Sequence, residues 1–126
     1  MAININTTLT TEAGSPVLAG SMIKVKVGFG NDILNRDEEG VYDGTFEQLM
    51  IADLGFLYIS KSAYQANPNL TIGQVQEFGS IYTKSMTLTE YNALMADGSL
   101  AEQWVVEYLN GILGAGVCTL VDPFTV

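Results

Sequence analysis

The sequence predicts an α+β fold, in which a mainly antiparallel β sheet, sandwich or small barrel is followed by a two-helix hairpin near the C-terminus. Apolar and polar residues alternate with a period of two in several segments before residue 87, which is typical of strands with one buried face. Two capping-box patterns then follow, which indicate helix starts. A chain of 126 residues, 48% of them apolar, is sufficient for one core. We therefore expect a single domain over residues 1–126.

Two strands are expected in the N-terminal quarter of the chain. The first is predicted over residues 3–9, polar on one face, and ends at the turn cluster 13–16. The second is predicted over residues 23–29, with Lys24 and Lys26 in water. Its apolar members Ile23, Val25, Val27 and Phe29 are expected to face the core. This alternation is the most regular in the sequence.

Residues 30–45 are predicted to form an acidic loop, because acids and glycines are dense there and only Arg36 balances the charge. From Asn35 to Gly40, oxygen-bearing side chains at positions 1, 3 and 5 precede a glycine at position 6, as in an EF-hand loop. Position 12 is Phe46 rather than a glutamate. We therefore assign no metal to the loop, and whether it binds an ion weakly stays open.

The middle of the chain contains a further apolar block. Residues 54–59 are predicted to form a strand buried on both sides, and residues 62–69 a turn or short helix that stops at Pro68. Alternation over residues 78–86 predicts another strand. Together with the preceding segments, these make residues 1–86 the β-rich part of the domain.

The helical hairpin is expected over residues 87–113. Thr87 with Glu90, and Ser99 with Glu102, fit the capping box, in which a hydroxyl and a carboxylate three residues later bind each other's backbone amides. The first helix should run to about residue 95, and the second to residue 109 or 113. The apolar face of the second is predicted to include Ala101, Trp104, Val105, Tyr108, Leu109 and Ile112. Residues 117–122 are expected to form a closing strand.

Composition excludes several functions. The chain has no histidine, a net charge of −9, and no basic residue after Lys84. Sequence-specific nucleic-acid binding and attachment to anionic membranes are therefore not expected, because both need clustered Lys and Arg. No signal peptide or membrane-spanning segment is expected, which predicts synthesis in a host cytoplasm. Cys118, the single cysteine, lies in an apolar run and is expected to be buried and inert.

Few groups could perform chemistry. The acids most embedded in apolar sequence are Asp53 and Glu107, which leave a carboxylate-pair hydrolase as a formal alternative. Trp104 and Tyr108 are candidates for core packing or an interface. The polar N-terminal strand is a candidate for pairing with a neighbour's sheet edge, within or between chains. Its candidate contact residues are Ile3, Ile5, Thr7 and Leu9. No catalytic residue, cofactor or small-molecule substrate is assigned.

Three stretches resemble small virion proteins of tailed bacteriophages, particularly head auxiliary and neck or tail ring proteins of crAss-like phages. They are the start MAININTTLTT, the segment SMIKVKV over residues 21–27, and SIYTKSMTLTEYNAL over residues 80–94. The resemblance implies a β-rich, non-enzymatic structural subunit without a cofactor. It also implies a location in the virion and assembly into a ring or onto a capsid lattice.

We therefore expect a structural subunit that forms or joins a ring at the head–tail connector by self-association, with itself and other virion proteins as partners. Only 15% of residues are charged, so uncharged surface should remain for another subunit to cover. One alternative is a capsid decoration protein. Another is a soluble protein- or glycan-binding module that uses residues 30–45 as its contact loop.

Overall fold

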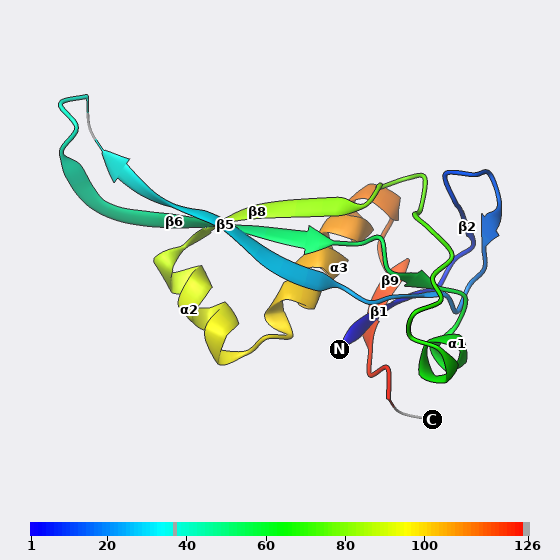
Figure 1. The fold of residues 1–126 in the computed structure, drawn as a ribbon. Coiled ribbons are helices and arrows are strands. Elements are labelled where there is room, and N and C mark those ends of the chain that lie inside the picture. Colours follow the sequence, from blue (N-terminus) through cyan, green and yellow to red (C-terminus); the bar gives the residue numbers. More distant parts are fainter. Residues whose placement is uncertain (37, 125–126) are drawn as a thin grey trace.

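Three antiparallel sheets and three helices make up the described part of the chain, residues 1–36 and 38–124, in this computed structural model (Figure 1). Side chains are described for residues 1–30, 38–41 and 47–124. The α+β class with mostly antiparallel strands and two C-terminal helices is confirmed. Which elements form each sheet differs in part from the prediction.

The first sheet has the strand order β7-β4-β1-β9. Its strands are β1 (Ala2–Ile5), β4 (Met22–Ile23), β7 (Leu57–Tyr58) and β9 (Cys118–Val121). The central strand β1 pairs with β4 on one side and with β9 on the other. A separate two-stranded sheet joins β2 (Leu9–Thr10) to β3 (Pro16–Val17). The first sheet therefore contains strands from the beginning and the end of the chain. Its strand β9 lies within the closing strand predicted over residues 117–122.

The second large sheet has the order β5-β6-β8, with β5 (Lys26–Arg36), β6 (Tyr42–Asp53) and β8 (Ile81–Thr87). Strand β8 follows the predicted alternation, with Tyr82, Lys84 and Met86 turned inward and their neighbours exposed. Helix α1 (Lys61–Ala66) contacts β7, which confirms the short helix before Pro68. Helix α2 (Leu88–Ala96) packs on β6 and β8, and α3 (Leu100–Leu113) packs on β9 and β1.

Two N-terminal strand predictions need correction. The strand predicted over residues 3–9 ends at Ile5, and Thr7 is exposed. The strand predicted over residues 23–29 is split, because Met22 and Ile23 pair in the first sheet while β5 begins in the second sheet at Lys26. The regular alternation continues through the change of sheet, so periodicity alone could not reveal the break. The two outer members of the predicted apolar face are exposed: Val27 by 38% and Phe29 by 44%.

The loop predicted over residues 30–45 is wrong in a more consequential way. Strand β5 continues to Arg36 and β6 begins at Tyr42, so most of this segment is a β-hairpin. Gly40 has φ +82, which an L side chain rarely adopts, and it therefore suits the connection between the strands. The buried strand predicted over residues 54–59 shrinks to β7, because residues 54–56 connect β6 to β7 without strand pairing and Ile59 is exposed.

The main core lies between the first sheet, the second sheet and α3. Its buried side chains come from every part of the chain, among them Ile3, Ile23, Met50, Met86, Leu109 and Cys118. A smaller cluster forms around Tyr58, whose hydroxyl donates to the Pro68 carbonyl at 2.6 Å. The hairpin is anchored in this core by Met50 and Ala52 of β6 and by Val25, the residue before β5.

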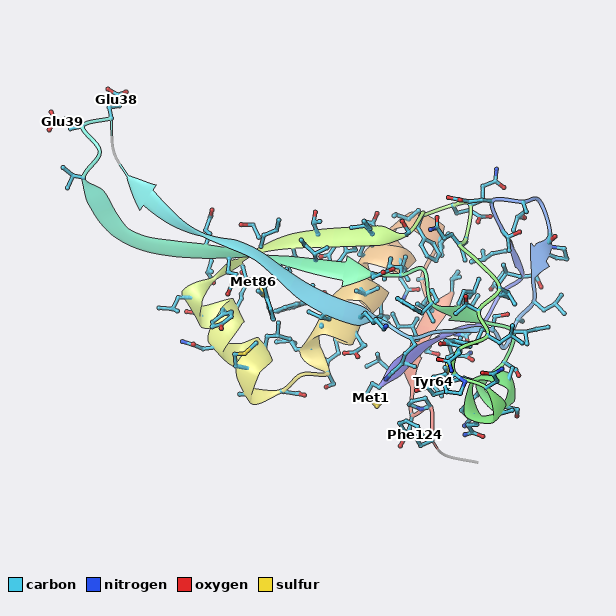
Figure 2. The ribbon with its side chains drawn as sticks, viewed as in Figure 1. Met1, Glu38, Glu39, Tyr64, Met86 and Phe124 are labelled. Carbon is cyan, nitrogen blue, oxygen red and sulfur yellow. The ribbon has the colours of Figure 1, made fainter. Side chains whose placement is uncertain are left out.

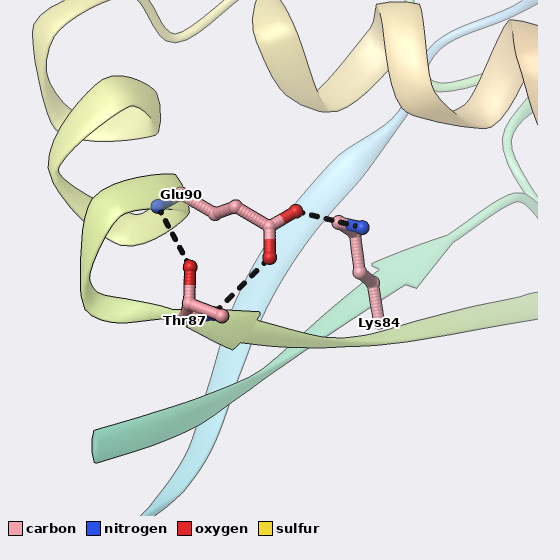
Figure 3. A network of polar contacts seen from close by, with 3 residues as sticks. All are labelled: Lys84, Thr87 and Glu90. Atoms are coloured by element: carbon pink, nitrogen blue, oxygen red, sulfur yellow. Dashed lines mark hydrogen bonds and ion pairs between the residues drawn. The ribbon is translucent and has the colours of Figure 1, made fainter. Parts of the chain in front are cut away.

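The capping box at the start of α2 is confirmed, whereas the one at α3 is wrong. Thr87 Oγ1 accepts from the Glu90 amide, and Glu90 Oε1 accepts from the Thr87 amide (Figure 3). The other Glu90 oxygen forms an ion pair with Lys84 at 2.9 Å, and these contacts lower the pKa of Glu90. Ser99 makes no side-chain cap bond, because its backbone is helical (φ −70, ψ −11) rather than in the extended conformation typical of an N-cap, and its hydroxyl donates to Asp97.

We predict that Thr87→Ala lowers the free energy of unfolding by about 1 kcal/mol, since it removes a cap bond at the N-terminus of α2. Ser99→Ala is the matched control, because Ser99 occupies the same position of α3 without that bond. Ser99→Ala should lower the free energy of unfolding clearly less than Thr87→Ala does. Urea denaturation followed by circular dichroism measures both. Equal losses of unfolding free energy in the two variants would contradict the assignment of a cap bond to Thr87 and none to Ser99.

Candidate assembly surface

The outer half of the β5–β6 hairpin projects from the body as an arm (Figure 1). Strand β8 pairs with β6 only over residues 47–53. Beyond that point β5 and β6 pair with each other alone, at Leu34 with Phe46 and Arg36 with Tyr42. We define the arm as residues 34–46, of which residue 37 is outside the described part. Glu38 and Glu39 lie at its far end, away from α1, α2 and α3 (Figure 2).

The arm lacks the support that usually stabilises strands. An isolated two-stranded hairpin is marginally stable in water, and three strands or packing on a helix are normally needed. Within the part of the chain that the structure describes, β5 has no second neighbour in its sheet. Its outer edge therefore presents backbone N–H and C=O groups that a further strand could bind.

Charge is concentrated on the same segment. Residues 30–47 contain six carboxylates and one arginine. The side chains of Glu38 and Glu39 at the arm's end are exposed. An acidic, extended ribbon of this kind repels other acidic surfaces, nucleic acid included, and is attracted to cationic ones.

The body end of the same ribbon carries cations. Lys24 directly follows β4, and its ammonium donates to the Met1 carbonyl at 3.2 Å. Lys26 begins β5, is exposed, and has its ammonium 4.2 Å from the centre of the Phe56 ring. We call Lys24 and Lys26 the root pair. Asp53 lies opposite Lys26 in the β5–β6 register, but its carboxylate accepts from the Gly55 amide.

Exposed apolar side chains lie on both edge strands of the second large sheet. Phe29 on β5 and Ile81 at the start of β8 are 44% and 58% exposed. Large apolar side chains are also exposed on the helices, namely Leu88, Met95 and Ile112. The prediction that Ile112 faces the core with Leu109 is therefore wrong, and the next residue, Leu113, packs partly against the core instead. The exposed apolar residues add uncharged surface on the second sheet, α2 and α3.

The predicted N-terminal contact residues do not form an open edge. Ile3 and Ile5 are fully buried on β1, whose two sides are occupied by β4 and β9 of the same chain. Thr7 is exposed beyond the strand, and Leu9 packs partly against the core from β2. Of the two pairings considered for this strand, within or between chains, the structure shows pairing within the chain. The edge strands of the first sheet are β7 and β9, and those of the second large sheet are β5 and β8.

The predicted aromatic pair on α3 comes together against β8. The Trp104 ring lies 5.0 Å from the Lys84 ammonium, and the Tyr108 ring centre lies 4.6 Å from that of Tyr82. Both side chains are partly buried and pack on the main core. Their principal contacts are therefore within the molecule, and what remains exposed lies near the edge of β8.

The acids considered for hydrolysis do not share an apolar cleft. Asp53 is engaged by the backbone of Gly55, and Glu107 lies on the exposed side of α3. Among the described residues, no three His, Cys, Asp or Glu side chains are placed to hold a metal ion. Most side chains of the EF-hand-like segment, residues 35–37 and 42–46, lie outside the described set.

Burial raises the pKa of the Cys118 thiol to about 11. The unfolded chain then releases this proton first as pH rises, so the thiol's contribution to stability is present below its ordinary pKa and is lost between that value and about 11. We predict that the unfolding free energy of the wild type falls more steeply with pH over this window than that of Cys118→Ala. Denaturation curves across the window measure the difference, and parallel slopes would contradict it.

Glu102 was expected to cap α3, and its burial was not anticipated. It is only 8% exposed, and its Oε2 has no hydrogen-bond partner within the part of the chain that is described. Its position in the first turn of α3 places the negative charge at the favourable end of the helix dipole. The signal was available in sequence, since Glu102 adjoins the apolar face that begins at Ala101.

A shallow, open hollow of about 340 Å³ lies between the β2–β3 turn and the segment before β8, with Thr11, Glu12 and Ile72 in its wall. With its amide nitrogen toward Glu12, Gln74 donates to that carboxylate at 3.1 Å. The polar groups of the hollow thus satisfy each other. The arrangement offers no converging set of groups that would select a small ligand.

No protein-family model, curated protein or solved structure matches the chain. Among the described residues, no helix has the length and apolar character needed to cross a membrane. Since the comparisons suggest no function, a function has to be argued from the arm, the root pair and the edge strands β5 and β8 of the second large sheet.

Proposed function

We propose that the chain is a non-enzymatic structural subunit that self-associates into a ring at the neck or tail of a tailed-phage virion. The observation that carries the proposal is the arm, a two-stranded ribbon that extends past β8 and, among the described residues, has no third strand and no helix beside it (Figure 1). Such a ribbon gains most of its stability when a neighbour covers it.

The second large sheet supplies the geometry for association. Strands β5 and β8 form its two edges, and both are long enough for intermolecular pairing. Natural sheet edges are commonly protected by charges, proline or short length. Between Val27 and Gly30, β5 has no charged residue, and β8 has only Lys84. Both edges therefore suit the addition of a strand from another copy.

The virion setting comes from the sequence resemblance to phage ring and head auxiliary proteins. A capsid decoration protein would use the same arm on a lattice, and is the alternative within this proposal. The difference lies in the product of assembly: a ring closes with a fixed copy number, whereas a decoration protein requires the capsid surface as its template.

Native mass spectrometry and sedimentation velocity of the purified chain test the proposal. We expect species well above the 13.6 kDa monomer at micromolar concentration, and closed rings in negative-stain micrographs. A chain that is monomeric at every concentration up to about 1 mM contradicts self-association. Turnover of a glycoside that Asp53→Asn abolishes without unfolding would contradict the non-enzymatic assignment.

A further inference from the structure

The hairpin carries opposite charge at its two ends. The root pair lies where β5 leaves the body, and Glu38 and Glu39 lie at the other end of the ribbon (Figure 2). Since a strand rises about 3.4 Å per residue, Lys26 and Glu38 are separated by roughly 40 Å of ribbon. Charges are screened over about 10 Å in ordinary salt, so the two ends cannot stabilise each other within one molecule.

Contact between two arm ends is unfavourable. Each arm end brings several carboxylates and one arginine, so two ends placed together repel. The last 42 residues of the chain contain five acids and no Lys or Arg, so they do not attract the arm either. The remaining lysines are Lys61 on α1 and Lys84, which is paired with Glu90. Lys24 and Lys26 are the two lysines closest to each other in the sequence, so the root pair offers an arm two positive charges two positions apart.

We propose that the arm end of one copy, through Glu38 and Glu39, binds the root pair Lys24 and Lys26 of a second copy. This inference rests on the proposed self-association and specifies its contact. Because the two surfaces are different and lie at opposite ends of one ribbon, each copy can give an arm to one neighbour and receive an arm from another. Such a heterologous contact generates rings when the rotation closes.

Reciprocal charge reversal tests the contact. The arm variant is Glu38→Lys with Glu39→Lys, and the root variant is Lys24→Glu with Lys26→Glu. The matched control is Glu77→Lys with Glu107→Lys, which changes net charge as the arm variant does, at exposed sites outside the arm. If the root variant unfolds, Lys24→Gln with Lys26→Gln replaces it when single variants are compared, since it removes both positive charges and keeps a polar side chain at each position. Recovery in the mixture is then tested with Lys26→Glu alone as the root variant. Circular dichroism confirms folding, and sedimentation velocity reports assembly.

We expect each reversed variant alone to require at least about 100-fold higher concentration for half-assembly, because like charges then meet at the contact. An equimolar mixture of the two variants should assemble again, since each arm then finds a complementary root. The control variant should assemble as the wild type does. Higher salt should weaken wild-type assembly.

The outcomes separate the two proposals. A wild type that never assembles overturns the proposed function, and this inference with it. A wild type that assembles while both reversed variants assemble equally well overturns only the arm–root contact. Loss of assembly in the single variants without recovery in the mixture also overturns it, because the charges would then act at separate places.

Discussion

Replacing residues 34–46 by Asn-Gly is expected to give a folded monomer that no longer assembles. The cut falls at the facing pair Ile33 and Glu47, and Glu47 is also the first residue of β6 that pairs with β8. All pairs between β6 and β8 are therefore kept. Asn-Gly favours the tight turn that joins two antiparallel strands.

The shortened chain is expected to be monomeric because it lacks the arm that is proposed to bind the next copy. It is expected to stay folded because the deleted residues pair only with each other. The body should keep its core, so the melting temperature should change by only a few degrees, on the order of 1 kcal/mol or less. Size-exclusion chromatography with light scattering measures the mass, and circular dichroism measures the melting temperature. The full-length control with Glu77→Lys and Glu107→Lys shows whether surface changes alone disturb assembly.

Two results would contradict this prediction. A shortened chain that assembles like the wild type would show that the arm is dispensable for association. A shortened chain that fails to fold would show that the arm stabilises the body, contrary to its lack of contacts with β8.

The largest effect on stability is expected for Leu109→Ala. Leu109 is fully buried in the main core, and truncation of such a side chain costs about 2–5 kcal/mol through lost burial and the cavity left behind. Ile112→Ala is the matched control on the same helix, because Ile112 is 48% exposed. Its cost should be about 0.5 kcal/mol or less.

Urea denaturation of both variants measures the difference. Similar losses of unfolding free energy in the two variants would contradict the orientation of α3, in which Leu109 is buried and Ile112 is exposed. A large loss for Ile112→Ala alone would indicate that α3 turns the opposite face to the core. If Ile112→Ala is stable but assembles less well, the exposed end of α3 belongs to the contact between copies.

Local rules predicted the C-terminal third well. The capping box at Thr87 acts within one turn, the alternation in β8 reflects one buried face, and α3 ends at Leu113, the later of its two predicted ends. Each of these signals depends on residues a few positions apart. The capping box at Ser99 failed because Ser99 adopts a helical backbone, whereas Thr87 is extended as a cap requires.

The hairpin could not be predicted by the same rules. Acids and glycines are typical of loops, and the residues that pair, such as Leu34 with Phe46, lie too far apart for short-range patterns to show. The passage from β4 to β5 at Lys24 was hidden because alternation continues across two sheets. Because the sequence analysis missed both features, it placed the contact residues on the N-terminal strand rather than on β5 and β8, the edge strands of the second large sheet.

The way the arm joins the body has a mechanical consequence. Both strands of the hairpin lead into buried residues, Val25 before β5 and Leu54 after β6, but their register shifts between Phe29 and Asp32 and again between Leu34 and Arg36. Such irregularities bend a strand and locally disrupt its hydrogen-bond ladder. A displacement imposed on the tip is therefore taken up first at these two places, and only the remainder reaches the packed interior.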